Sequence, residues 1–198
     1  MQGQNRSDYG KWEICALDME RNIFILNRWS WEEKIDMYCV LDCAKDEIIT
    51  LPTDSYKLLD FWAYHDGWCY FDIHEDWSSG ICRVVGISLE GDQKEIMTMT
   101  SSHNKIKEKY NYTESICRME VVEDRIYIIF GGYFGSDSYF QGGSLITMKL
   151  DGSDYRAIEC KEDAFVICKD GDRILVYFPY YWPQEDWSKE KKRYLMGV

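Results

Sequence analysis

The sequence is poor in proline and histidine and has no long apolar run. Only 3 of its 198 residues are proline and 3 are histidine. No window approaches the roughly 18 consecutive apolar residues of a membrane-spanning helix, and residues 1–13 contain no apolar core of a signal peptide. The expectation is therefore a soluble cytoplasmic protein without membrane insertion, or an extracellular one if the chain was excised from a longer exported protein.

The motifs of familiar catalytic and metal sites are also missing. The chain has no G-x-S-x-G, no H-E-x-x-H, no Walker loop and no C-x-x-C pair. His74 is followed by two acids and could contact a metal, but such a group more often lies in a solvated loop. We therefore expect no catalytic residue, no metal and no cofactor, and a binding protein more than an enzyme.

Positive charge is scarce, and cysteine is present without a disulfide pattern. The net charge is −12, so the phosphates of nucleic acids would be repelled, and nucleic acid is not an expected partner. Most of the 8 cysteines sit inside apolar runs, where cysteine behaves as a small buried hydrophobe. A chain of this length without a signal peptide favours free thiols over a disulfide framework.

Aromatic residues are abundant and strand-like segments recur. Tyrosine occurs 15 times and tryptophan 8 times, which favours an all-β fold. Residues 60–99 contain four short strand-like runs, with hairpin signals at Asp66-Gly67 and Glu90-Gly91-Asp92. A similar layout recurs at intervals of about 50 residues, as expected of a repeat protein.

These repeats predict one β-propeller-like domain over residues 1–198, because four-stranded units of this size pack around an axis as blades. The expected blades are approximately 12–52, 58–99, 116–160 and 164–198, with a surface insertion at 100–115 containing at most one helical turn. A Gly-rich aromatic loop is expected over 131–143, and the last blade lacks its outer strand. The chain is either a compact four-bladed ring or a piece of a larger propeller, whose open strand edge could mediate self-association.

The repeat resembles a known family. D-G-W-C-Y-F followed by I-S-L-E-G-D over 67–96, and D-R-I-Y-I-I followed by M-K-L-D-G-S-D-Y over 124–158, resemble the blades of YWTD propellers related to the low-density lipoprotein receptor. They are also similar to a bacterial domain of unknown function with repeats of the type D-G-x-I-Y-Y and L-D-G-S. The YWTD tetrapeptide itself is absent. The resemblance implies a mostly non-catalytic binding module, often part of a cell-surface protein.

The loops between second and third strands share aromatic and acidic residues, and Glu75-Asp76-Trp77-Ser78 recurs as Glu185-Asp186-Trp187-Ser188. One explanation is a face that binds a protein, peptide or carbohydrate, since aromatic rings stack on sugars and grip side chains. The other is that each tryptophan folds over its own hairpin and only stabilises it. The candidate ligand-binding residues are Trp29, Trp31, Trp77, Tyr133, Tyr139, Trp182, Trp187, Glu75, Asp76, Glu185 and Asp186.

The competing class is a carbohydrate-active hydrolase. Such enzymes use two carboxyl groups in one pocket. The loops offer acids on the same predicted face, namely Glu32, Glu75, Asp76, Asp137, Glu185 and Asp186. A third possibility is a purely structural piece of a larger propeller.

Overall fold

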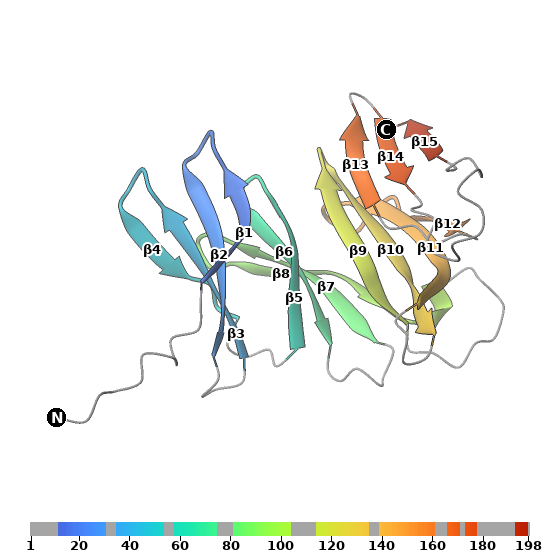
Figure 1. Cartoon of the computed structure of the whole chain (residues 1–198), viewed down its shortest axis with the longest axis horizontal. Coiled ribbons are helices and arrows are strands. Elements are labelled where there is room, and N and C mark those ends of the chain that lie inside the picture. Colours follow the sequence, from blue (N-terminus) through green and yellow to red (C-terminus); the bar gives the residue numbers. More distant parts are fainter. Residues whose placement is uncertain are drawn as a thin grey trace, which may run out of the picture. The chain divides into compact units, whose positions relative to one another are not determined.

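The protein is built from β-strands arranged in sheets (Figure 1). The computed structural model describes residues 12–30, 35–53, 58–74, 81–103, 114–134, 139–160, 166–170, 173–177 and 193–197. Three sheets have four antiparallel strands each, and in all three the strand order follows the chain. The expected all-β fold with repeated four-stranded sheets is therefore confirmed. A 3₁₀ turn, η1 (Ser101–His103), lies where one helical turn was expected, and no described helix is long and apolar enough to cross a membrane.

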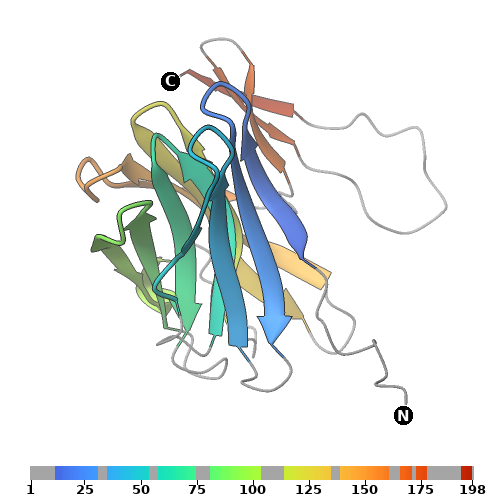
Figure 2. The ribbon, with the colours of Figure 1, turned by 90° about the vertical axis from the view of Figure 1, so that its left-hand side faces the viewer.

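In the first sheet, two strands end with an aspartate whose side chain accepts hydrogen bonds from the following turn. Its strands are β1 (Glu13–Asp18), β2 (Ile23–Ser30), β3 (Ile35–Asp42) and β4 (Glu47–Thr50). Oδ1 of Asp18 accepts hydrogen bonds from the amides of Glu20 and Arg21 at 3.1 and 3.0 Å, and Asp42 does the same for Ala44 and Lys45. A carboxylate that satisfies turn amides favours the chain reversal at that place. Figure 2 shows the strands of this sheet side by side.

The second sheet confirms both hairpin signals. Its strands are β5 (Leu58–His65), β6 (Trp68–His74), β7 (Cys82–Ser88) and β8 (Gln93–Met99). Asp66 and Gly67 join β5 to β6 with φ of 45° and 81°, and two successive positive φ values are what a tight type I′ hairpin requires. Gly91 has a φ of 91° in the turn between β7 and β8.

The third sheet has longer strands than the sequence suggests. Its strands are β9 (Glu114–Val122), β10 (Arg125–Phe134), β11 (Tyr139–Lys149) and β12 (Arg156–Cys160). The prediction of a loop over 131–143 is wrong for most of that range, because Gly131 pairs with Gly143 and Tyr133 with Phe140. The register shifts between Gly131 and Tyr133. Glycine within a strand permits such a β-bulge, so these glycines bend the hairpin without ending it.

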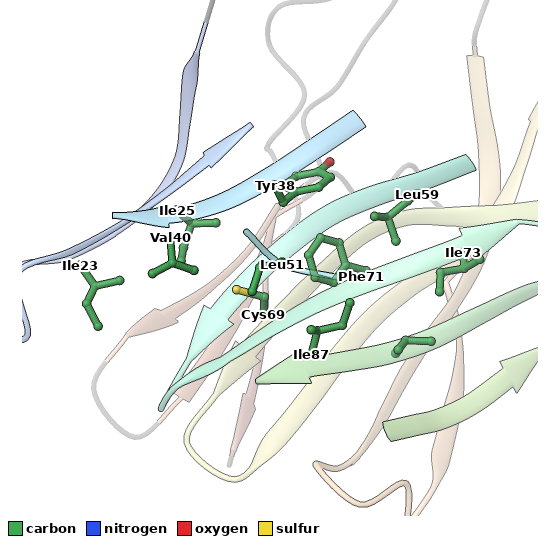
Figure 3. Packing of buried hydrophobic residues seen from close by; sticks show 11 residues of the cluster. Ile23, Ile25, Tyr38, Val40, Leu51, Leu59, Cys69, Phe71, Ile73 and Ile87 are labelled. Atoms are coloured by element: carbon green, nitrogen blue, oxygen red, sulfur yellow. The ribbon is translucent and has the colours of Figure 1, made fainter. Parts of the chain in front are cut away.

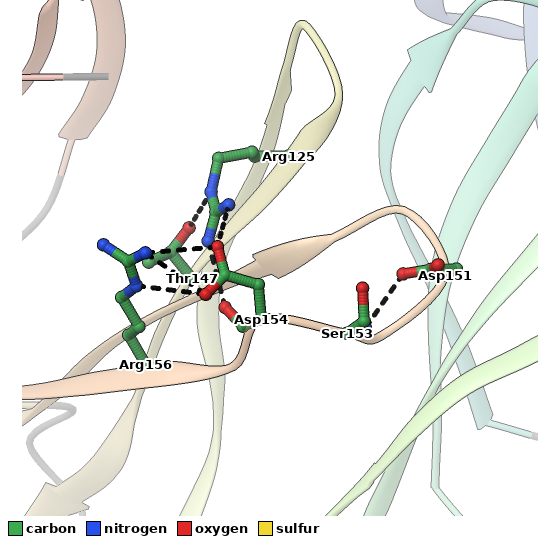
Figure 4. Close-up of polar contacts among 6 residues, drawn as sticks. All are labelled: Arg125, Thr147, Asp151, Ser153, Asp154 and Arg156. Carbon is green, nitrogen blue, oxygen red and sulfur yellow. Dashed lines mark hydrogen bonds and ion pairs between the residues drawn. The ribbon is translucent and has the colours of Figure 1, made fainter.

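A network of polar contacts closes the turn between β11 and β12 (Figure 4). Arg125, at the start of β10, donates from Nη1 to Oδ2 of Asp154 at 2.7 Å and from Nε to Oγ1 of Thr147 at 3.1 Å. Arg156 contacts the same carboxylate from the other side. The hydrogen bond from Arg125 holds the pKa of Asp154 below its usual range. The sequence Asp151-Gly152-Ser153-Asp154 is thus a hairpin whose last carboxylate is fixed by two arginines.

The fourth sheet has three described strands. They are β13 (Val166–Asp170), β14 (Arg173–Tyr177) and β15 (Arg193–Gly197), and they pair antiparallel in chain order. β13 lies against β9 of the third sheet. All three strands lie within the last predicted blade, 164–198.

A hydrophobic core lies between the first and second sheets (Figure 3). The first sheet contributes alternate residues of its strands, and the second sheet contributes Phe71 and its neighbours from β5 to β7. Phe71 is fully buried, and its ring meets those of Tyr38 and Phe61 edge to face at 5.1 and 5.6 Å between centroids. Edge-to-face aromatic contacts add to the stabilisation from apolar burial. The members of this core are Ile23, Ile25, Tyr38, Val40, Leu51, Leu59, Cys69, Phe71, Ile73, Val85 and Ile87.

The first sheet is apolar on its other face as well. Directly paired residues share a face, and the register gives the rows Leu17–Phe24–Leu41–Ile48 and Ile14–Leu26–Cys39 on the side opposite to the core. We call these seven residues the outer face of the first sheet. Ile48 is 69% exposed and Ile14 is 65% exposed. A sheet exposed to water on one face normally alternates apolar and polar residues, and this sheet does not.

Candidate functional site

The predicted loop residues fall partly inside the described strands. Trp29 pairs with Asp36 near the end of β2, and Tyr133 pairs with Phe140 in the third sheet, while Tyr139 is the first residue of β11. These positions lie at what we call the loop end, the end of each sheet where its second and third strands are connected. The other candidates, Trp31, Glu75, Asp76, Trp77, Trp182, Glu185, Asp186 and Trp187, lie outside the described residues.

A buried pair of polar side chains lies at the loop end of the second sheet. His74 is the last residue of β6, and its Nε2 lies 2.8 Å from Oδ2 of Asp72. The side chains are 2% and 1% exposed. The expectation that His74 belongs to a solvated loop is therefore wrong. Residues two apart on a strand share a face, so the strand places this histidine above the aspartate and away from water.

Trp62 holds the second oxygen of the same carboxylate. Its indole nitrogen donates to Oδ1 of Asp72 at 2.8 Å. The register between β5 and β6 shifts between Phe61 and Ala63, so Trp62 is the extra residue of a β-bulge. Bulges re-aim side chains next to functional sites. Both oxygens of Asp72 are thereby engaged, which satisfies a carboxylate that has been removed from water.

Asp60 faces Asp72 across the two strands and adds a second carboxyl group. Asp60 as a whole is exposed, but partial loss of solvent around its carboxyl group raises its pKa to about 6, with further contributions from the negative charges of Asp72 and Asp36 and an opposing one from His74. Two carboxylates in a directly opposed pair repel one another. The loop end of the second sheet is therefore a place where positive charge would be stabilised.

Three tryptophans with described side chains contact partners within the protein. The guanidinium of Arg28 lies 5.2 Å from the ring centre of Trp12, and Nζ of Lys94 lies 4.1 Å from that of Trp68. Gly86 makes room for this stack, because a Cβ there would lie 3.2 Å from the ring of Trp68. Together with Trp62, these residues show tryptophan in contact with other side chains of the protein at three places in the chain.

Comparison with known proteins does not assign the chain to a family. No family model matches the chain, and no curated protein matches its sequence. The resemblance to YWTD repeats therefore rests only on the sequence motifs over 67–96 and 124–158. The structure shows an all-β protein with three four-stranded antiparallel sheets among the described residues.

Sequence reasoning missed two residues of the buried polar cluster, Trp62 and Asp72, and misplaced His74. One signal was present: Asp72 and His74 are separated by a single residue inside a run that is otherwise apolar and aromatic. Charged residues inside such a run are buried when the strand is covered on both faces. The bulge that brings Trp62 onto the same carboxylate leaves no comparable pattern.

Proposed function

We propose that this protein is a non-catalytic binding or scaffolding module whose sheets are blades of a β-propeller. The observation that carries the proposal is the outer face of the first sheet, where apolar rows repeat the character of the core face. A sheet with two apolar faces has to be covered on both to be stable in water. Blades of a propeller meet this requirement, because each one packs between two others.

We propose further that the four sheets form a compact ring, in which each sheet is covered on both faces. The recurrence of the same meander in the first three sheets and of three of its strands in the fourth supports this arrangement. The alternative is a piece of a larger propeller, in which a further blade would cover the outer face of the first sheet. An uncovered apolar face would promote self-association instead.

The ligand proposed for this module is a protein, peptide or carbohydrate held at the loop end. Support comes from the register, which places Trp29, Tyr133 and Tyr139 close to the second-to-third strand connections, and from the repeated Glu-Asp-Trp-Ser sequence in two such connections. Aromatic rings beside carboxylates suit sugar faces and basic peptide side chains. The six described cysteines with free thiols support a reducing, cytoplasmic location.

The described carboxylates do not favour the hydrolase alternative. A glycosidase needs two carboxyl groups about 5–10 Å apart in one pocket, with oxygens available to the substrate. Asp72 is buried and both its oxygens are occupied by Trp62 and His74. The acids proposed for hydrolysis, Glu32, Glu75, Asp76, Asp137, Glu185 and Asp186, lie outside the described residues.

Screening on glycan and peptide arrays tests the ligand proposal. We expect the wild type to bind at least one probe class, and the double variant Trp77→Ala/Trp187→Ala to lose about 1–3 kcal/mol of binding per removed ring while keeping its unfolding midpoint. Trp68→Ala is the matched control, since that ring stacks on Lys94: it should lower stability and leave binding unchanged. Loss of stability in the double variant with no change in binding would show that these tryptophans only stabilise their hairpins.

A further inference from the structure

We draw no further inference here: the strongest candidate, the side-chain cluster of Trp62, Asp72 and His74 at the loop end of the second sheet, belongs to the site already described, and the hydrogen bonds that engage both oxygens of the Asp72 carboxylate come from β5 and β6 themselves and point to no ligand.

Discussion

Replacing Phe71 with alanine should lower the free energy of unfolding by about 3–5 kcal/mol. Phe71 is fully buried between the first and second sheets, and its ring contacts the edges or faces of Tyr38 and Phe61. The substitution removes apolar burial from both sheets and leaves a cavity that the surrounding strands cannot fill. Equilibrium unfolding in urea measures the loss as a lower midpoint at an unchanged slope.

The control for this prediction is Met19→Ala. Met19 lies in the turn after β1 with 72% of its surface exposed, so its loss should change stability by about 0.5 kcal/mol or less. A Phe71→Ala variant that loses no more stability than Met19→Ala would contradict the core described between the first two sheets. A reduced slope would show instead that the substitution altered the cooperativity of unfolding.

Gly152→Ala is the substitution with the second largest expected effect, a loss of about 2–4 kcal/mol. Gly152 has a φ of 83°, which an L-residue adopts only with strain. A Cβ at this position would also lie 2.5 Å from the backbone carbonyl oxygen of Ile96. Backbone atoms cannot move aside as a flexible side chain can, so the turn or β8 has to shift. Thermal and urea unfolding both report this loss.

Gly91→Ala separates the two causes. Gly91 has a similar φ of 91°, but a Cβ there would meet no atom within 4 Å. Its substitution should therefore cost only the conformational strain, about 1 kcal/mol. The difference between the two variants measures the close approach of Gly152 to Ile96. Equal losses would contradict that contact.

Much of the fold could be predicted because its signals are local. Asp66-Gly67 predicts a tight hairpin through the positive φ values that it allows, and the structure contains that hairpin. The strands of all four repeats follow from short apolar runs bounded by such turns. The prediction of a loop over 131–143 was wrong for a physical reason. Glycine also occurs at β-bulges, and the sequence does not show whether two glycines pair across a hairpin.

The buried polar cluster of Trp62, Asp72 and His74 could not be predicted in the same way. It depends on the register between β5 and β6 and on a bulge at Trp62. Each of these is a non-local property, and a shift of one residue in register would turn Asp72 to the other face. The aromatic loop residues were predicted from a recurring pattern, and of these only Trp29, Tyr133 and Tyr139 fall within described strands.

We propose that both faces of the first sheet are covered, as in a closed propeller. Hydroxyl-radical footprinting of the full chain, on a sample shown to be monomeric by sedimentation, tests it most directly. The oxidation rates of Leu17 and Ile48 on the outer face are compared with those of Met19 and Ile81, and each rate is normalised to that of the same residue in the unfolded chain. Protection of Leu17 and Ile48, with Met19 and Ile81 reactive, is the result that we predict. Reaction of all four residues at similar normalised rates in the monomer would show that the outer face is open, and would contradict the closed arrangement.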